Sequence, residues 1–226
     1  MMLKQITAAF AAVLAIGAAP PQSKNFVTNV TRTATGSHLI GNPEAKDTLV
    51  EFVSYTCGHC AAFEREGAEL MKAQYVATGR MKFEVRHRVL NVVDMTVATG
   101  VHCLPTAKFF TAHSAMLRSQ DKWLAKASSA TASQQARWKA GTPRDKMRAV
   151  ASDIGLYDML GRHGLSRSQL DNCFGDPAVY QPITDQTAAA SKRGINGTPT
   201  FELNGVRLAA ITAREVLFVL ENAIKR

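Results

Sequence analysis

Residues 49–60 read Leu-Val-Glu-Phe-Val-Ser-Tyr-Thr-Cys-Gly-His-Cys, an apolar run followed directly by two cysteines with two residues between them. The β-branched and aromatic content of residues 49–55 predicts a buried strand. The composition of residues 61–71, rich in alanine and glutamate, predicts a helix. The cysteine pair therefore lies at a strand-to-helix junction, and its spacing allows a reversible dithiol/disulfide pair. This pattern indicates redox chemistry.

The start of a helix gives the two cysteines different expected properties. The thiolate is the reactive form of cysteine, and the unpaired N–H groups and positive dipole end of a helix stabilise an anion. We therefore expect Cys57 to be acidic, and His59 to lower its pKa further by adding a positive charge or a donor. Cys60 lies one helical turn further in, next to apolar residues, and is expected to be the buried resolving partner.

A zinc site is the alternative interpretation of two cysteines at this spacing. Structural zinc needs a second pair of ligands. The remaining cysteines, Cys103 and Cys173, are far apart in the sequence, and neither belongs to a second unit of this kind. The sequence therefore favours redox chemistry over metal binding.

The first residues resemble a secretory signal. A lysine at position 4 precedes an apolar stretch over residues 6–19, which is too short to span a bilayer. We interpret residues 1–19 as a signal peptide, cleaved after Gly17 or Ala19, with an uncleaved anchor as the alternative. Export to the periplasm would favour disulfides. Cys103 and Cys173 are then expected to form a structural disulfide or to remain two free, buried thiols, and the sequence leaves this choice open.

Composition limits the classes of partner. The chain has 226 residues, 46% of them hydrophobic and 20% charged, which is typical of one globular domain with an elaboration. Its net charge of +9 is scattered along the chain. Basic residues do not alternate with aromatic ones, so nucleic acid is not indicated. Anionic membrane surfaces or acidic client segments are the expected attractants.

The pattern of elements predicts an α/β fold interrupted by helices. Strands are predicted near residues 26–31 and over residues 81–90, and residues 92–192 have helical spacing without a clear strand. Residues 200–208 form a predicted hairpin with Asn-Gly at its turn, and a capping box starts a final helix at position 212. We accordingly divide the exported chain into parts 20–91, 92–192 and 193–226, with the middle part inserted.

These features together resemble the DsbA-like thiol:disulfide oxidoreductases. The resemblance rests on residues 50–60, the helical insertion, the sequence Gly-Thr-Pro-Thr over residues 197–200 and the closing hairpin and helix. It covers nearly the whole exported chain. It implies a thioredoxin fold with a helical domain inserted between the central strands and a cis-proline hairpin.

The resemblance also implies roles for individual residues. Cys57 would be the attacking cysteine and Cys60 its resolving partner, while Pro199 would be a cis-proline packed against the disulfide. Thr198 would present its backbone to an extended client peptide. Glu51 matches a buried acidic residue that assists proton movement at the partner thiol.

The family also implies a cycle and its partners. Reduced exported client proteins would receive disulfides, and a membrane quinone-linked oxidoreductase would reoxidise a monomeric enzyme. No metal or organic cofactor is needed, because the disulfide carries the two electrons. The best-known members carry proline where this chain has Gly58, and Cys-Gly-His-Cys is also the motif of protein disulfide isomerases. The reduction potential known for the family therefore cannot simply be assigned to this chain.

Two rival functions stay open. One is a disulfide isomerase or reductase of the same fold, although residues 20–50 are too few for the dimerisation domain that dedicated bacterial isomerases carry. The other is an extracytoplasmic metal chaperone. Oxidation of clients is the preferred interpretation. We expect the side chain of Glu64 to face solvent, and the remaining histidines to lie at the surface or its boundary (His38, His87, His102, His113 and His163).

Overall fold

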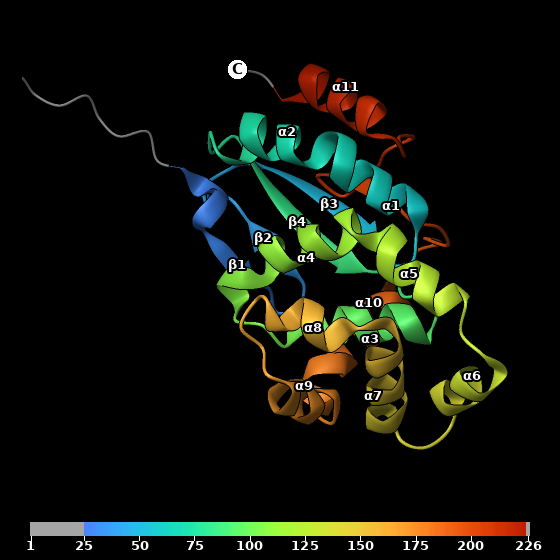
Figure 1. Cartoon of the computed structure of the whole chain (residues 1–226). Helices are drawn as coiled ribbons and strands as arrows, with labels where there is room; N and C mark the ends of the chain where they lie inside the picture. Colours follow the sequence, from blue (N-terminus) through green and yellow to red (C-terminus); the bar gives the residue numbers. More distant parts are fainter. Residues whose placement is uncertain (1–24, 225–226) are drawn as a thin grey trace, which may run out of the picture.

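A computed structural model describes residues 25–224. Its centre is a six-stranded sheet with the strand order β1-β2-β4-β3-β5-β6 (Figure 1). Strands β3 and β4 run parallel, and the other neighbouring pairs are antiparallel. The strand bounds are β1 Val30–Arg32, β2 His38–Ile40, β3 Asp47–Val53, β4 Met81–His87, β5 Thr200–Leu203 and β6 Val206–Arg207.

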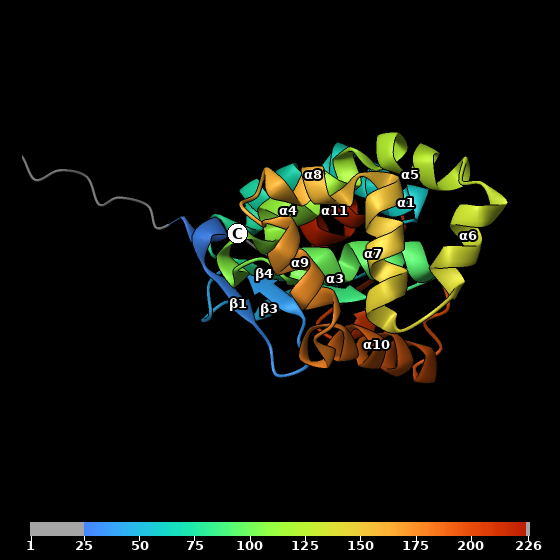
Figure 2. The same cartoon turned by 60° about the horizontal axis from the view of Figure 1, so that its bottom comes forward.

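Helices cover both faces of the sheet and extend beyond it (Figures 1 and 2). The first helical segment consists of α1 Gly58–Phe63 and α2 Glu69–Met71, with π-helical turns over Glu64–Ala68 and Lys72–Val76. The helices between β4 and β5 are α3 Val92–His102, α4 Phe109–Arg118, α5 Gln120–Ser128, α6 Ala132–Lys139, α7 Pro143–Ile154, α8 Leu156–Gly161, α9 Arg167–Phe174 and α10 Pro177–Lys192. Helix α11 Ala213–Ala223 follows the hairpin and packs beside the first segment, where Gly67 meets Ala213. Short 3-10 turns span Phe26–Thr28 and Thr106–Lys108.

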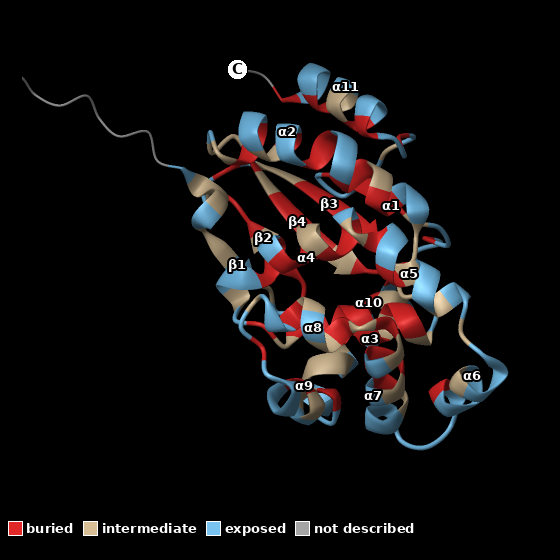
Figure 3. Ribbon diagram, viewed as in Figure 1, coloured by how far each residue is buried: buried red, intermediate tan, exposed pale blue. Residues whose placement is uncertain are grey.

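Strand β3 is buried on both faces, which explains its continuous apolar character. Val50 and Phe52 contact Ala190 and Ile195 at the end of α10. Alternation along the strand places Leu49, Glu51 and Val53 on the opposite face, and the two leucine and valine side chains join the large core there. Figure 3 shows the buried residues on the inner faces of the strands and helices. The strand that leads to the cysteine pair is thus the centre of the molecule.

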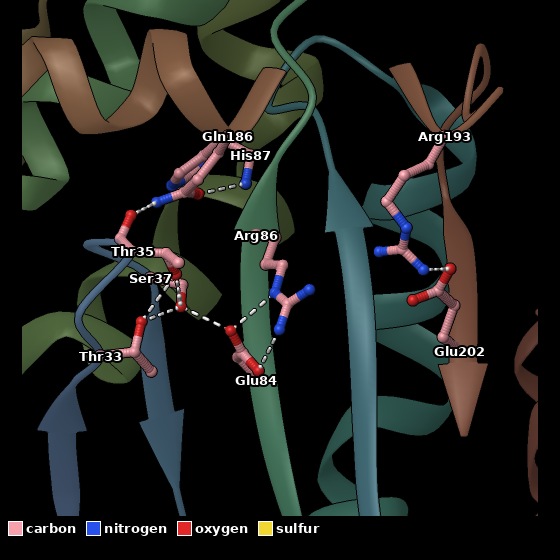
Figure 4. Close-up of polar contacts among 9 residues, drawn as sticks. All are labelled: Thr33, Thr35, Ser37, Glu84, Arg86, His87, Gln186, Arg193 and Glu202. Atoms are coloured by element: carbon pink, nitrogen blue, oxygen red, sulfur yellow. Dashed lines mark hydrogen bonds and ion pairs between the residues drawn. The ribbon is translucent and has the colours of Figure 1, made fainter. Parts of the chain in front are cut away.

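Polar contacts fix α10 against the sheet (Figure 4). Gln186 accepts a hydrogen bond from the N–H of His87 at 2.8 Å and donates to the carbonyl of Thr35 at 3.0 Å. Arg193, which follows α10, donates to Glu202 of β5 at 2.6 Å. Because these partners lie on β4, before β2 and on β5, α10 is held in one position over the end of β4.

The expected helical insertion is present: α3 begins at Val92 and α10 ends at Lys192. The predicted hairpin and the capping box at Thr212 are confirmed. The expected strand over residues 26–31 is wrong in its first half, which is a 3-10 turn. The division of the chain into domains stays a prediction, and the proposed signal, residues 1–19, lies outside the described residues. Between residues 25 and 224, no helix has both the length and the apolar character needed to cross a membrane.

The surface placement expected for the histidines is wrong for four of them, which are buried: His38, His87, His102 and His113. They surround Phe109, whose ring stacks on His38 with centroids 3.6 Å apart. Nε2 of His87 lies 2.9 Å from Nε2 of His102, so the two imidazoles share one proton. These rings are neutral and occupy core positions that apolar side chains usually fill. A histidine that stands alone in the sequence gives no sign of this role. His163 does lie at the boundary.

The buried histidines predict acid sensitivity. Burial lowers the pKa of His38 and His87 to about 3, and lowers the pKa of His102 and His113 well below 6.5. Each histidine therefore contributes stability that is fully present above its unfolded pKa and is lost as pH falls toward its folded pKa. The slope is about 1.4 kcal/mol per pH unit for each histidine. Buried acids with raised pKa, including Asp94 at about 6, have the opposite slope and offset part of this effect.

A single substitution isolates the histidine contribution. His38→Phe keeps a ring stacked on Phe109, and we expect it to reduce the pH dependence of the free energy of unfolding between pH 6 and 4 by about 1.4 kcal/mol per pH unit. Urea titrations at several pH values measure this slope. His163→Gln is the control and should change the slope less, since His163 is only partly buried. An unchanged slope in His38→Phe would contradict the assignment of a neutral buried imidazole.

Candidate active site

The cysteine pair begins helix α1, at the end of β3. Cys57 is the N-cap residue, with extended backbone angles (φ −89°, ψ 120°), and Gly58 is the first helical residue. The space around Gly58 is open, because a Cβ atom added to this residue would meet nothing within 4 Å. Cys57 is partly exposed and Cys60 is fully buried, and both are free thiols in this structure. The side chain of His59 is exposed.

The environment makes Cys57 an acidic thiol. Its pKa is lowered to about 5, chiefly by a hydrogen bond from the Cys60 thiol and against the opposing effect of burial. The backbone N–H groups of His59 and Cys60 also lower it, as expected for the first turn of a helix. At neutral pH the Cys57 sulfur is therefore a thiolate, which is both a nucleophile and a good leaving group.

Cys60 has the opposite character. Burial raises the pKa of its thiol well above the ordinary value, and the hydrogen bond that it donates to Cys57 acts in the same direction. Cys60 thus stays protonated while Cys57 is ionised. The two sulfurs differ in charge and exposure, so a reagent from solvent meets Cys57 first.

A loop that precedes β5 borders the Cys57 sulfur. The peptide bond between Thr198 and Pro199 is cis. When protonated, the Cys57 thiol donates to the carbonyl oxygen of Thr198, at a sulfur-to-oxygen distance of 3.0 Å. Among the described residues, the buried hydroxyl of Thr198 has no hydrogen-bond partner. It can donate to the sulfur once the thiol proton has left.

Glu51 lies within the sheet below the cysteine pair. Its carboxyl group is fully buried, and within residues 25–224 neither of its oxygens has a hydrogen-bond partner. Burial raises its pKa well above the ordinary range, and the charges of Glu64 and Cys57 raise it further. The carboxyl group is therefore held protonated next to a pair of thiols.

Gln120, at the start of α5, binds the backbone of the active-site junction. Its buried side-chain amide donates to the carbonyl of Tyr55 at 2.7 Å and to that of Cys57 at 2.9 Å. The Cys57 carbonyl also accepts the first helical hydrogen bond, from the N–H of Ala61 at 3.2 Å. Gln120 therefore fixes the peptide unit that joins Cys57 to Gly58.

Comparison with known proteins identifies the family. A family model described as thioredoxin matches residues 33–222. The chain belongs to the thioredoxin family. The thioredoxin fold expected from the sequence is thereby confirmed.

Several relatives of this thioredoxin-family chain carry names that refer to protein disulfides. A crystal structure of "protein-disulfide isomerase from Novosphingobium aromaticivorans" is 38% identical, with a TM-score of 0.80 over 84% of this chain and 98% of that one. The "Putative protein-disulfide oxidoreductase" of Rickettsia bellii is 24% identical over 83% of this chain and 64% of its own length. Wolbachia pipientis alpha-DsbA1, 22% identical with a TM-score of 0.66 over 82% of this chain and 89% of that one, shares the fold. The chain thus spans less than two thirds of the length of the first curated relatives that it matches.

The structure of this thioredoxin-family member brings Cys57, Cys60 and Thr198 together, with Glu51 beneath them. The side chain of His59 is not part of this group: it makes no hydrogen bond to any described residue, and only its backbone N–H acts on the sulfur. Between residues 25 and 224, no group of three or more histidine, cysteine, aspartate or glutamate side chains is placed to hold a metal ion.

The solvent-facing position expected for Glu64 is wrong. Its carboxylate is buried, accepts a hydrogen bond from Ser114 and lies 3.6 Å from the Lys72 ammonium. Burial raises its pKa. The helix passes into a π-helical turn at this residue, and α4 supplies the hydrogen-bond partner. Neither Glu64 nor Gln120 carried a signal in the sequence, because the hydrogen-bond partners that hold them lie 50 or more residues away along the chain.

Loss of the Gln120 amide should raise the pKa of Cys57. Gln120→Leu removes both donors while keeping similar volume, and we expect the Cys57 pKa to rise by about one pH unit as the helix start loses its fixed orientation. The ultraviolet absorbance of the thiolate, followed against pH, measures this change.

Two further variants test the cause. Gln181→Leu, at an exposed glutamine of α10, is the matched control and should leave the Cys57 pKa unchanged. Adding Gly58→Pro to the Gln120→Leu variant should bring the Cys57 pKa most of the way back to its wild-type value. Proline suits position 58, because this is the first helical residue and the ψ angle of Cys57 is one that a residue before proline adopts. A Cys57 pKa that does not move in Gln120→Leu would show that the amide does not set the thiol's acidity.

Proposed function

We propose that this chain is a thiol:disulfide oxidoreductase that introduces disulfides into reduced, exported client proteins through the Cys57–Cys60 pair. The observation that carries the proposal is the difference between the two thiols: the pKa of Cys57 is about 5, whereas that of Cys60 is raised well above its ordinary value. A stabilised thiolate favours the reduced state of the pair, and a pair whose reduced state is stabilised is a strong oxidant of other thiols.

The proposed reaction starts from the oxidised enzyme. A client thiolate attacks the Cys57 sulfur, the bond between Cys57 and Cys60 breaks, and Cys60 leaves with the electron pair. Glu51, protonated and electrostatically coupled to Cys60, supplies the proton that the leaving thiolate takes up. A second client thiolate then attacks the client sulfur of the mixed disulfide and releases the Cys57 thiolate. Two client thiols become one disulfide, and the enzyme disulfide becomes a dithiol.

Client binding would use the loop before β5. The backbone of Thr198 lies beside the Cys57 sulfur, so an extended client segment can pair with it as an added strand. Pro199 would keep the loop in the shape that presents this carbonyl. Reoxidation would come from a membrane quinone-linked oxidoreductase, and the enzyme would act as a monomer outside the cytoplasm, in the periplasm. No cofactor beyond the disulfide is required, because the thiol exchange balances its own electrons.

The reduction potential of the Cys57–Cys60 pair is the deciding measurement. Equilibration with mixtures of reduced and oxidised glutathione should give a potential less negative than about −180 mV, the value typical of protein disulfide isomerase. The oxidised protein should also form disulfides in a reduced, unfolded client. A pair that cannot be reduced and reoxidised in this way would disprove the proposal.

A disulfide isomerase or reductase is the second candidate, favoured by the printed name of the 38% identical relative. A potential near that of the glutathione pool, together with efficient repair of a scrambled client, would support it over the oxidant. Tight, stoichiometric binding of copper or zinc without dithiol oxidase activity would instead support a metal chaperone.

A further inference from the structure

We propose that a groove at the end of β4 is a client subsite that receives a bulky apolar side chain of the polypeptide being oxidised. This inference rests on the proposed function. The groove has a volume of about 420 Å³, and its lining includes Leu90, Val92, Met95, Lys146, Met147 and Tyr180. We call it the Leu90 groove. Its volume falls in the range of about 300–1,000 Å³ that is usual for ligand pockets.

The Leu90 groove is directly connected to the active site. Asn91, in the groove lining, donates to the hydroxyl of Thr56 at 3.0 Å, and Thr56 precedes Cys57. The buried carboxylate of Asp94 makes a second connection, because it accepts hydrogen bonds from the N–H groups of Tyr55, at 2.8 Å, and Leu90, at 2.9 Å. These hydrogen bonds therefore join the groove rim to the cysteine loop.

The strand order places the groove where a bound client would reach it. Strand β3, which leads to Cys57, lies between β4 and β5. The Thr198 backbone comes just before β5, whereas Leu90 comes just after β4, so the two flank the cysteine on opposite sides. A client strand that pairs with Thr198 and crosses the Cys57 sulfur runs toward the Leu90 groove.

The walls of the groove are held in place before any client binds. The N–H of Val89 donates to the hydroxyl of Thr187 on α10 at 3.0 Å, next to the contact between Gln186 and His87. Helix α3 packs against both α7 and α10, and these three helices supply the walls (Figure 2). A preformed groove binds a side chain without the cost of ordering its own walls.

The chemistry of the lining defines the occupant. Most of the lining is aliphatic, aromatic or thioether surface, and the Leu90 side chain, 47% exposed, is accessible to a bound side chain. Lys146 is the charged residue of the lining. The expected occupant is therefore a leucine, methionine or phenylalanine near the client cysteine, with an acidic residue close by.

The test compares peptides that differ only near their cysteines. Each dithiol peptide carries leucine at one position within four residues of a cysteine, and its twin carries serine there. Rates of oxidation by the oxidised full chain are divided by the rate for dithiothreitol, which needs no groove. We expect the best leucine peptide to react about tenfold faster than its serine twin, in line with burial of one aliphatic side chain.

Matched variants assign this preference to the groove. Leu90→Asp, and the uncharged variant Leu90→Ser, should reduce the leucine-to-serine ratio toward one. Leu70→Asp is the control, because Leu70 is 48% exposed on α2, away from the groove lining, and it should keep the wild-type ratio.

Three outcomes would overturn the subsite: a ratio of one in the wild-type protein, an equal loss of preference in Leu70→Asp, or a dimer in sedimentation experiments that Leu90→Asp dissociates. The last would make the groove a contact between copies of this chain. Failure of the wild-type protein to oxidise dithiothreitol would instead disprove the proposed function itself.

Discussion

Replacing Cys60 with serine is expected to trap the protein as a mixed disulfide through Cys57 and to lower turnover by at least about a thousandfold. Cys57 remains beside Thr198, keeps the backbone N–H groups of the first helical turn and can still attack a disulfide. Without the buried resolving thiol, the mixed disulfide can be released only by an outside thiol. Incubation with oxidised glutathione, followed by mass measurement of the intact protein, detects the trapped adduct.

Cys57→Ser is the matched control for this experiment. It also abolishes turnover, but the remaining thiol is buried and its pKa is raised, so we expect little or no adduct. Comparable adduct in the two variants would contradict the assignment of attacking and resolving roles, because the structure gives the two sulfurs unequal access to solvent.

Removal of the disulfide between Cys103 and Cys173 is expected to destabilise the protein by about 4 kcal/mol. The bond joins the C-cap of α3 to α9 across a sequence separation of 70 residues. Without it, the unfolded chain gains the freedom that the closed loop had removed. The double variant Cys103→Ala/Cys173→Ala, compared with wild type by urea unfolding, measures the difference in the free energy of unfolding.

The double variant avoids leaving a third free thiol that could exchange with Cys57. Wild-type protein with only the active-site pair reduced is the proper reference, so that both proteins unfold from the same state of Cys57 and Cys60. The reduction potential of that pair serves as the control and should be retained. A loss of stability below about 1 kcal/mol would show that the bond does not restrain the unfolded chain as the loop model requires.

The elements that the sequence predicted correctly are those whose pattern lies within a few neighbouring residues. Strand β3, the hairpin around Asn204 and the helix capped by Thr212 can each be recognised from a pattern within a few residues. Strand β2 was not predicted, because its three residues include a histidine and are too short to show a period. Its identity as a strand depends on pairing with β1 and β4.

The residues of the active site also fall into those that the sequence could reveal and those that it could not. Cys57, Cys60 and the Thr198–Pro199 pair could be found because their spacing and order are distinctive. Gln120 and Glu64 could not be found, because an isolated glutamine or glutamate in a helix is usually exposed. Their positions are set by how α4 and α5 pack against the first helical segment, and this packing is a property of the whole fold.

The open space around Gly58 affects which substitutions this protein can accept during evolution. A side chain added at this position touches no other part of the molecule, so most substitutions there leave the core as it is. They act instead on the first turn of α1, and hence on the Cys57 thiolate, where about 1.4 kcal/mol corresponds to 30 mV of reduction potential. A lineage can therefore adjust the oxidising strength of this molecule by changing one residue, without repacking its core. The same change shifts the folding stability of the reduced form relative to the oxidised form by an equal free energy.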